Sequence, residues 1–352
     1  MNATAAASKS KDEIVLACRN SDATNAIVRG RLAPAGVNLR VVENNDVPKM
    51  FEGMARGDYD VAEMSMAEFI YYRSRGQADF IGIPVFPSRV FRHGYIYCNA
   101  AAGITSPELL SGKKIGFLRW VQTAFVWVRG MLVEDYGVSA KDTKWYTKSL
   151  HHWKEEAGTE VNDIHPQDGS RFYTLEDRAG MDEYETICSA LIDGELDAIA
   201  VTENIRYAKL FAGNERVVRL FPKPRLEEAA YFKRTGIFPV MHLIVAKEKI
   251  LAENPGLAEK LFTLFCESKR IGKKWVRSTP SLALAWKDEY LEDEAKIFAS
   301  DPWVFGLHEN ERLLSKFLAY CYDQGVSATK MMPRDLFARE SWEFREPPPA
   351  RG

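Results

Sequence analysis

Three observations in the sequence predict an α/β protein of two lobes. Short β-rich runs alternate with helical patterns over the first hundred residues, and the same alternation restarts after residue 100 without a sequence repeat. Two longer extended segments, at 94–100 and 238–246, lie between the two series. Alternating strands and helices favour right-handed βαβ units. We therefore expect two small, mostly parallel sheets flanked by helices and joined by a two-strand hinge.

The first lobe is expected to alternate four strands with three helices. Each strand is a short run rich in apolar residues, and each helix has apolar residues at helical spacing. The expected strands are Ile14–Cys18, Asn38–Val42, Asp60–Met64 and Phe80–Phe86, and the expected helices are Thr24–Gly30, Val47–Arg56 and Met66–Ser74.

The second lobe is expected to follow the same order, with Gly137 and Gly194 closing two of its helices. The expected helices are Ser106–Leu110, Thr123–Tyr136 and Tyr184–Leu191, and the expected strands are Lys113–Leu118, Lys144–Ser149, Leu196–Val201 and Val217–Phe221. Residues 151–181 are polar and irregular, which predicts an inserted surface loop, either a lid or a solvated decoration.

The second extended segment is expected to return the chain to the first lobe, where a helical extension completes it. A long helix starts at Asn254 and runs to about Val276. The predicted units are lobe 1 (12–94 and 239–345, with the helical C-terminal part), lobe 2 (95–238), and flexible tails at 1–11 and 346–352.

Composition excludes several classes of protein. The chain has 352 residues, with 47 Lys and Arg against 49 Asp and Glu, for a net charge of −2. That balance argues against a nucleic-acid binder that relies on a basic surface. No signal peptide and no run of 18 apolar residues is found, so we expect no membrane partner and a cytoplasmic location. The five cysteines are widely spaced, which favours reduced, buried thiols.

Polar residues that follow the predicted strands are candidates for a ligand site, because ligands bind beyond the carboxyl ends of strands. In a two-lobed protein these ends meet in the cleft between the lobes. The substrate-binding candidates are Arg19, Asp22, Ser65, Arg89, Arg92, Trp120, Gln122, Thr123, Glu203 and Arg234, and Glu63 also follows a strand.

This set suits an aromatic anion. Arg89, Arg92 and Arg234 offer forked donors that match a carboxylate. Trp120, with Tyr95 and Tyr231, offers flat surface, and the helix beginning at Thr123 has free N–H groups. His93 and His242 are the candidates for proton transfer. Taken singly, each residue is more often a core group or an ion-pair partner, so only their convergence indicates a site.

Other motifs are absent. The sequence has no GxGxxG, no P-loop, no GxSxG and no HExxH. No three His, Asp or Glu residues have the spacing of a metal site. The sequence leaves open a divalent metal site built from side chains that are far apart in the chain.

Four segments resemble the 4,5-dihydroxyphthalate decarboxylase family. They are FIGIPVFPSRVFRHGYIYCN (80–99), GKKIGFLRWVQTAFVWVRGMLVEDYGV (112–138), YFKRTGIFPVMH (231–242) and WVFGLHENERLLSKFLAYCYDQGVSATKMMPRDLFA (303–338). The resemblance spans almost the whole chain and implies a type II periplasmic-binding-protein-like fold. It implies non-oxidative loss of CO2 from a dihydroxylated aromatic dicarboxylate, giving protocatechuate, with no organic cofactor. The matching arginines would clamp carboxylates, and His93 or His242 would donate the proton or polarise a hydroxyl.

The sequence departs from the family pattern in three segments that are predicted to line the cleft. Ala23 and Asn25 stand where the family pattern has two arginines, and Leu118–Val121 and Glu203-Asn204 also differ. Fewer cations predict one fewer substrate carboxylate or a different acid.

We therefore expect a cofactor-independent decarboxylase of a small aromatic carboxylate. The alternatives are a binding or sensing protein for such an anion and a relative with a decayed site. Self-association is left open.

Overall fold

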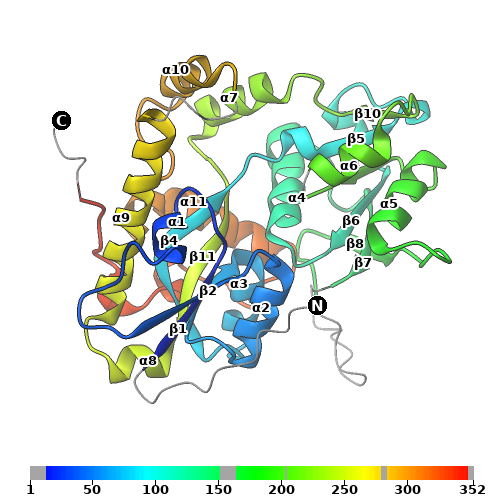
Figure 1. Ribbon diagram of the computed structural model, residues 1–352. Helices are drawn as coiled ribbons and strands as arrows, with labels where there is room; N and C mark the ends of the chain where they lie inside the picture. The colour runs from blue at the N-terminus through cyan, green and yellow to red at the C-terminus, as the bar shows by residue number, and fades with distance from the viewer. Residues whose placement is uncertain (1–12, 151–163, 203, 279–283, 348–352) are drawn as a thin grey trace.

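The computed structural model describes residues 13–150, 164–202, 204–278 and 284–347, and it contains two mixed β-sheets flanked by helices (Figure 1). The expected α/β class with two sheets is confirmed. Within the described residues, no helix combines the length and the apolar character that crossing a membrane requires.

The first sheet has five strands in the order β2-β1-β3-β11-β4. β1 is parallel to β2 and β3, whereas β11 runs antiparallel between β3 and β4. A strand from the later part of the chain therefore lies inside the first sheet. The strands are β1 (Ile14–Cys18), β2 (Leu39–Glu43), β3 (Val61–Ser65), β4 (Phe80–Arg89) and β11 (Val240–Lys247).

The second sheet has six strands in the order β10-β5-β9-β6-β7-β8. β9, β6, β7 and β8 are parallel, and β5 is antiparallel to both β9 and β10. The strands are β5 (Ile96–Asn99), β6 (Lys114–Arg119), β7 (Lys144–Ser149), β8 (Arg171–Thr174), β9 (Ala198–Ala200) and β10 (Val217–Arg219).

Helices cover both sheets, and local sequence signals explain where several of them begin and end. The Asp46 carboxylate accepts a hydrogen bond from the Lys49 N–H at the start of α2, and Gly57 ends that helix with a φ of 86°. The helices are α1 (Asn25–Val28), α2 (Val47–Arg56), α3 (Met66–Ser74), α4 (Thr123–Tyr136), α5 (Glu183–Ile192), α6 (Asn204–Phe211), α7 (Pro224–Thr235), α8 (Glu248–Glu253), α9 (Leu257–Ser278), α10 (Lys287–Phe298) and α11 (Leu307–Asp323). Short 3-10 turns are η1 (His93–Tyr95), η2 (Ala100–Ala102), η3 (Pro107–Leu110), η4 (Pro333–Leu336) and η5 (Arg339–Ser341).

The structure differs from the expected elements in several places. β8 lies inside segment 151–181, where the sequence predicted a loop, and it pairs with β7; residues 151–163 of that segment lie outside the described residues. α6, α7 and α8 were not expected, and the long helix expected from Asn254 begins at Leu257. Glu346, at the edge of the expected C-terminal tail, accepts hydrogen bonds from Lys269 and from the Phe305 N–H. The tails at 1–11 and 348–352 lie outside the described residues.

The C-terminal helix α11 packs on α4, which belongs to the second series of elements. Trp127 of α4 stacks on Phe317 of α11 at 4.9 Å between ring centroids. The Gln324 side chain, just after α11, donates to the Val126 carbonyl and accepts from the Arg129 guanidinium. α11 therefore ties the two series of elements together, and the lobe boundaries drawn from the sequence stay a prediction.

Candidate functional site

A buried carboxylate, Glu63 of β3, joins an arginine and a histidine from two other segments. Arg19, just after β1, donates to Glu63 Oε1 from Nε at 2.9 Å. His242 Nδ1 of β11 lies 2.6 Å from the same oxygen. Burial alone would raise the pKa of Glu63, but the Arg19 charge and the His242 hydrogen bond outweigh it and lower the pKa to about 2. Glu63 is therefore ionised at neutral pH.

Strand register explains why these groups meet. His242 pairs with Ser65 of β3 on one side and with Ser88 of β4 on the other. Paired residues of adjacent strands share a face of the sheet, and so do residues two apart in one strand, which places Glu63 diagonal to His242. The Phe51 ring of α2 meets the His242 ring edge-on at 5.0 Å. The imidazole is thus held between the Glu63 carboxylate and the Phe51 ring.

His242 is neutral at neutral pH in this structure. Burial lowers the pKa of His242, the Arg19 and Arg92 charges lower it further, and Glu63 acts in the opposite direction. Because an ionised Glu63 can only accept, Nδ1 carries the hydrogen and Nε2 keeps its lone pair. The side chain retains 15% exposure. Nε2 is therefore the ring atom available to a ligand.

Arg92 is a buried cation beside this histidine, and its partners are weak for a charged group. Its Nη1 donates to the Thr202 carbonyl at 3.0 Å, whereas Nε and Nη2 point at the Met241 thioether sulfur at 3.3 and 2.8 Å. Among the described residues, no carboxylate lies within ion-pair distance of it. Burial lowers the pKa of Arg92 to about 10, so the guanidinium remains charged at neutral pH. A buried cation with no carboxylate partner within ion-pair distance among the described residues favours an anionic ligand.

The first residues of α4 pack against the same sheet. The Ser65 and Thr123 hydroxyls lie 3.0 Å apart, and Thr123 Oγ1 also accepts from the Ala67 N–H at 2.9 Å. The Trp127 indole N–H donates to the Val240 carbonyl at 2.9 Å. Gln122 precedes the helix, and its Oε1 is buried without a hydrogen-bond partner among the described residues. The structure thus brings together Arg19, Ser65, Arg92, Gln122, Thr123 and His242 of the predicted set.

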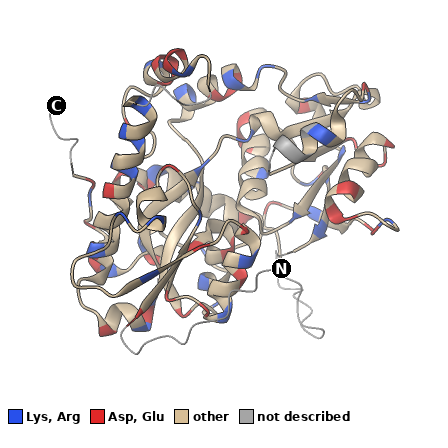
Figure 2. Ribbon diagram, in the orientation of Figure 1, with Lys and Arg blue, Asp and Glu red and all other residues tan. Residues whose placement is uncertain are grey.

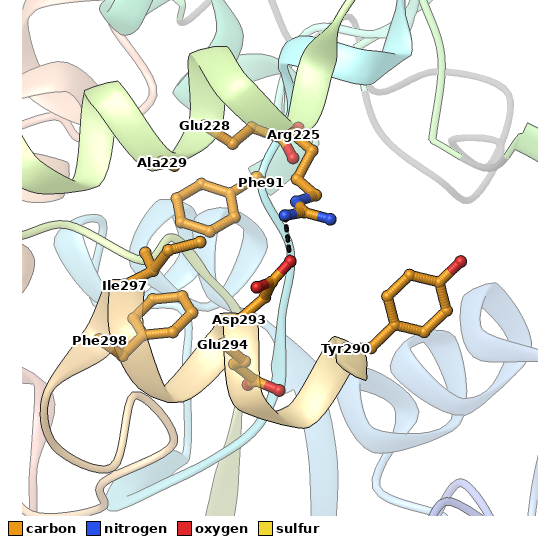
Figure 3. Close-up of a pocket in the computed structure, with 9 residues that line it drawn as sticks. All are labelled: Phe91, Arg225, Glu228, Ala229, Tyr290, Asp293, Glu294, Ile297 and Phe298. Atoms are coloured by element: carbon orange, nitrogen blue, oxygen red, sulfur yellow. Dashed lines mark hydrogen bonds and ion pairs between the residues drawn. The ribbon is translucent and has the colours of Figure 1, made fainter. Parts of the chain in front are cut away.

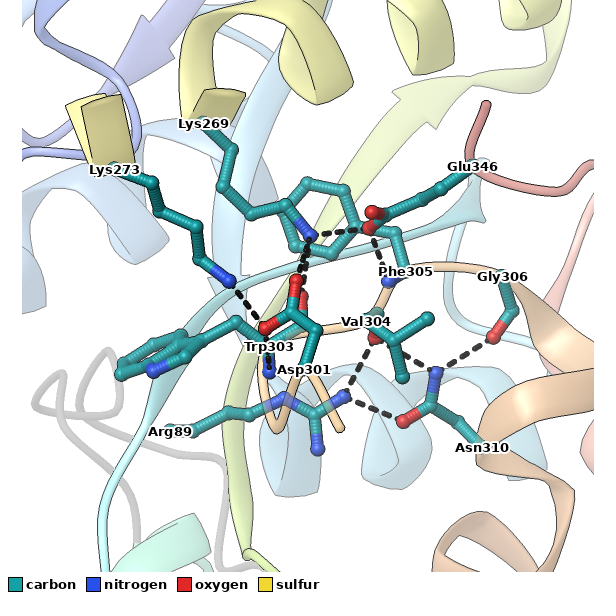
Figure 4. A network of polar contacts seen from close by, with 10 residues as sticks. All are labelled: Arg89, Lys269, Lys273, Asp301, Trp303, Val304, Phe305, Gly306, Asn310 and Glu346. Carbon is teal, nitrogen blue, oxygen red and sulfur yellow. Dashed lines mark hydrogen bonds and ion pairs between the residues drawn. The ribbon is translucent and has the colours of Figure 1, made fainter. Parts of the chain in front are cut away.

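Two predicted ligand contacts have partners inside the chain instead. The Arg89 guanidinium donates to the Phe238 and Val304 carbonyls and to the Asn310 side chain, within a polar network that includes the C-terminal segment (Figure 4). Trp120 is fully buried and donates to the Gln324 carbonyl at 3.0 Å. Both side chains tie distant segments of the chain together in this structure.

His93 and Arg234 lie in a different neighbourhood. His93 is 1% exposed, is surrounded by the rings of Tyr136, Phe221 and Tyr231, and neither ring nitrogen has a hydrogen-bond partner among the described residues. Burial, aided by the Arg234 charge, lowers the pKa of His93 to about 3. Arg234 is half exposed and lies 3.4 Å from Asp135. His93 is therefore neutral and enclosed.

Of the last two predicted residues, only Asp22 is described, and it is not part of the Glu63 group. Asp22 is exposed and lines a hollow of about 30 Å³ with Lys269, Lys273 and Trp303. Glu203 lies outside the described residues. A larger hollow, of about 230 Å³, lies between α7 and α10 (Figure 3). Neither of these two hollows is lined by Glu63 or His242.

Sequence reasoning noted Glu63 after its strand but did not put it forward as a site residue. The signal was present, because Glu63 is the only charged residue in the strand VAEMS. The pairing of Ser88 with His242 could not be predicted, since nothing local shows that its strand neighbours β11. Among the described residues, no group of three or more His, Cys, Asp or Glu side chains could hold a metal ion.

Two curated relatives are similar to this chain. It is 30% identical to the 4,5-dihydroxyphthalate decarboxylase of Comamonas testosteroni over 340 residues, which cover 95% of this chain and 98% of the relative. It is 34% identical over 175 residues to a Pseudomonas putida protein of the same name, covering 49% of this chain and 64% of the relative. No protein-family model matches the chain.

Solved structures share the fold at low identity. The periplasmic aliphatic sulphonate binding protein SsuA from Escherichia coli superposes with a TM-score of 0.54 at 15% identity, covering 94% of this chain and 93% of that one. The alkanesulfonate-binding protein SsuA from Xanthomonas axonopodis pv. citri gives 0.53 at 10% identity, covering 94% and 99%. The predicted periplasmic-binding-protein-like fold is therefore confirmed.

Proposed function

Because this chain belongs to the 4,5-dihydroxyphthalate decarboxylase family, whose members are carboxy-lyases, we propose that it removes one carboxylate of a hydroxylated aromatic dicarboxylate as CO2. The first candidate substrate is 4,5-dihydroxyphthalate, with protocatechuate as the product. The observation that supports this proposal best is the Arg19–Glu63–His242 group beside Arg92, a buried cation with no ion-pair partner among the described residues. It offers charge for carboxylates and a positioned group for proton transfer.

The chemistry needs one proton and one electron-donating hydroxyl. In 4,5-dihydroxyphthalate each carboxylate has a hydroxyl para to it, which pushes an electron pair into the ring. An acid then protonates the ring carbon that bears the carboxylate. The bond from this carbon to the carboxylate breaks, its electron pair restores the aromatic ring, and CO2 leaves. The ring gains one proton for each CO2 released, so the acid must be reloaded in every turnover.

Arg92 is the proposed carboxylate clamp. Its Nε and Nη2 hydrogens share one sulfur acceptor, and a carboxylate would offer them two oxygens in the geometry that a guanidinium fork matches. Arg19 uses Nε and Nη2 for Glu63 and is 29% exposed, which leaves its other terminal nitrogen for the second carboxylate. Ser65 and Thr123 can orient the hydroxyls once their mutual contact opens.

His242 is the proposed proton donor, and substrate binding is the event that charges it. Burial, together with the Arg19 and Arg92 cations, lowers the pKa of His242 in the free protein. A bound dianion offsets these charges and therefore favours the imidazolium. Glu63 is already ionised and accepts from Nδ1, so it stabilises the imidazolium and keeps Nε2 turned to the ring carbon. Proton uptake should thus accompany binding.

We also propose a reducing compartment, the cytoplasm, for this protein. Cys18, Cys98, Cys188, Cys266 and Cys321 are all free and buried. Reduced buried thiols are typical of cytoplasmic proteins.

The test is to incubate chelator-treated protein with 4,5-dihydroxyphthalate and to follow CO2 release together with protocatechuate absorbance. We expect turnover by the native protein, loss of at least about 100-fold in His242→Gln, and no change in His308→Gln, an exposed histidine of α11. Turnover lost in His93→Phe but kept in His242→Gln would transfer the donor role to His93. A substrate-induced rise in melting temperature without CO2 release would support the binding-protein alternative.

A further inference from the structure

Arg92, just beyond β4, has a weak hydrogen-bond partner for a buried cation, the thioether of Met241. Most charged residues of the chain lie on helices and loops, and the strands of the first sheet carry few charges (Figure 2). Arg92 is nevertheless only 6% exposed, and Met241 of β11 is 2% exposed. A thioether sulfur accepts hydrogen bonds weakly, and the burial of a charged group is costly without strong partners. The sulfur therefore satisfies the guanidinium poorly.

The orientation of the Arg92 guanidinium is set by two other neighbours. Its Nη1 donates to the Thr202 carbonyl at 3.0 Å, and its central carbon lies 5.1 Å from the centre of the Tyr95 ring. The remaining edge, formed by Nε and Nη2, faces the Met241 sulfur at 3.3 and 2.8 Å. An arginine can bind both oxygens of a carboxylate with these two nitrogens. The sulfur therefore lies where a carboxylate of the substrate would bind.

A β-bulge places Met241 beside this edge. Val240 of β11 pairs with Arg89 of β4. His242, two residues further along β11, pairs with Ser88, which is only one residue from Arg89, so Met241 is the extra residue. A bulge changes the direction of the side chain that it carries, and bulges are frequent beside active sites. In a regular strand Met241 would face away from His242. The bulge thus lets consecutive residues supply the proposed proton donor and the partner of the proposed clamp.

The backbone beside Met241 is anchored, so its side chain is the part that can move. The Val240 carbonyl accepts from the Trp127 indole N–H at 2.9 Å. The Pro239 carbonyl accepts from the Val90 N–H at 3.0 Å. A methionine side chain has three rotatable bonds and adapts to irregular space. A carboxylate can therefore displace the sulfur from the guanidinium without a change in the backbone of β11.

We propose that Met241 is a positioning residue that sets the affinity of Arg92 for the substrate carboxylate. Its sulfur holds the Arg92 fork in place in the free protein, and it is a weak enough acceptor to be replaced by a carboxylate. A stronger acceptor at position 241 would compete with the substrate. A side chain without an acceptor would leave the fork unsatisfied in the free protein and so strengthen carboxylate binding. This inference rests on the proposed function, in which Arg92 binds a substrate carboxylate.

The experiment measures the binding of phthalate to the full chain by isothermal titration calorimetry. Phthalate has both carboxylates but no hydroxyl to push electrons into the ring, so it reports on binding without the reaction. We expect Met241→Leu to lower the dissociation constant by about 3- to 10-fold and Met241→Gln to raise it by about 10-fold. Met54→Leu, which makes the same change at a buried methionine of α2, is the matched control and should leave the constant unchanged. Circular dichroism verifies that each variant is folded.

Two further measurements separate this role from a general effect on packing. Damage to the packing of β11 would weaken phthalate binding in both variants and would lower kcat through His242. The proposed role instead shifts KM in opposite directions and leaves kcat within about two-fold. In an Arg92→Gln background, either change at Met241 should alter the phthalate dissociation constant by less than about two-fold. Shifts in the same direction, or shifts that persist in that background, would overturn the proposal.

The outcomes also distinguish this inference from the proposed reaction. Opposite shifts in phthalate binding, in a chain that releases no CO2 from 4,5-dihydroxyphthalate, would support the role of Met241 and count against the reaction. Normal turnover with the same phthalate dissociation constant in the native chain and in both Met241 variants would refute the role of Met241 alone. A native chain that does not bind phthalate at millimolar concentration would overturn both the clamp and this inference.

Discussion

Replacing His93 by phenylalanine removes a titratable ring that has no hydrogen-bond partner among the described residues. The rings of Tyr136, Phe221 and Tyr231 lie within 5.9 Å of the His93 ring, centroid to centroid, and two of them are closer than 5.3 Å. A neutral imidazole fits this enclosure, whereas an imidazolium would be a buried charge without a partner. The pH dependence of stability should therefore carry a contribution from this one side chain.

The magnitude follows from the difference in proton affinity between the folded and unfolded chains. The pKa of His93 falls from 6.5 to about 3 on folding, because burial disfavours the charged ring and Arg234 adds repulsion. Stability from the neutral ring is complete above pH 6.5 and is lost as the pH falls towards 3. At pH 4.5 the unfolded chain is protonated and the folded chain is not, which lowers the free energy of unfolding by about 3 kcal/mol.

The assay is urea unfolding of the native chain and His93→Phe at pH 7.5 and at pH 4.5. All other titrating groups contribute to both proteins. The difference between their losses of unfolding free energy on acidification is therefore due to His93. We expect acidification to lower the free energy of unfolding of His93→Phe by about 3 kcal/mol less than that of the native chain. The control variant His308→Phe should lose as much as the native chain. Equal losses in the native chain and in His93→Phe would refute the reasoning.

Three further predictions concern the proposed site and the packing of α9. Glu63→Gln should lower kcat by about 100-fold with little effect on KM. Because Glu63 raises the pKa of His242, the fall of kcat at high pH should also begin at a lower pH in this variant. An unshifted pH profile would contradict this role of Glu63. Arg92→Gln should raise KM by about 10- to 100-fold in steady-state assays, with a smaller effect in Arg92→Lys, and an unchanged KM would exclude the clamp. Gly272→Ala should lower the free energy of unfolding by about 1 to 3 kcal/mol in thermal unfolding, because a Cβ there would lie 1.9 Å from the Asp22 carbonyl oxygen. A variant as stable as the native chain would show that the backbone at Asp22 moves away freely.

Elements with strong local signals were predicted closely from the sequence. α2, α3 and α4 have the bounds that apolar spacing and glycine positions indicate. α7 was missed although Pro224 at its start and Gly236 after its end are ordinary helix signals. β8 is short and mostly exposed, so it lacks the apolar run that identifies a strand. The sequence thus predicted the helices with clear apolar spacing, whereas end signals alone did not reveal α7.

Long-range pairing was beyond the reach of the sequence. The segment 238–246 was correctly expected to be extended, but its antiparallel place between β3 and β4 depends on residues more than a hundred positions away. That place decides the site, because it sets His242 between Ser65 and Ser88 and diagonal to Glu63. Arg89 shows the same limit, because the sequence around an arginine at the end of a strand is the same whether its side chain binds a ligand or the carbonyl of Val304.

The position of β11 also has a consequence for the order in which the protein is completed during synthesis. About 150 residues separate the end of β4 from the start of β11. At ribosomal rates of roughly 5–20 residues per second, β3 and β4 wait on the order of ten seconds for the strand that belongs between them. Their inner edges stay open to other strands during that time.

The second sheet, which the ribosome starts later, has all its strands before β11 emerges. The half that begins the chain is therefore finished last, and the histidine of the proposed site arrives with the strand that finishes it. A nascent chain arrested before residue 240 would carry a complete second sheet beside an open first one, and such a chain is a natural target for chaperones.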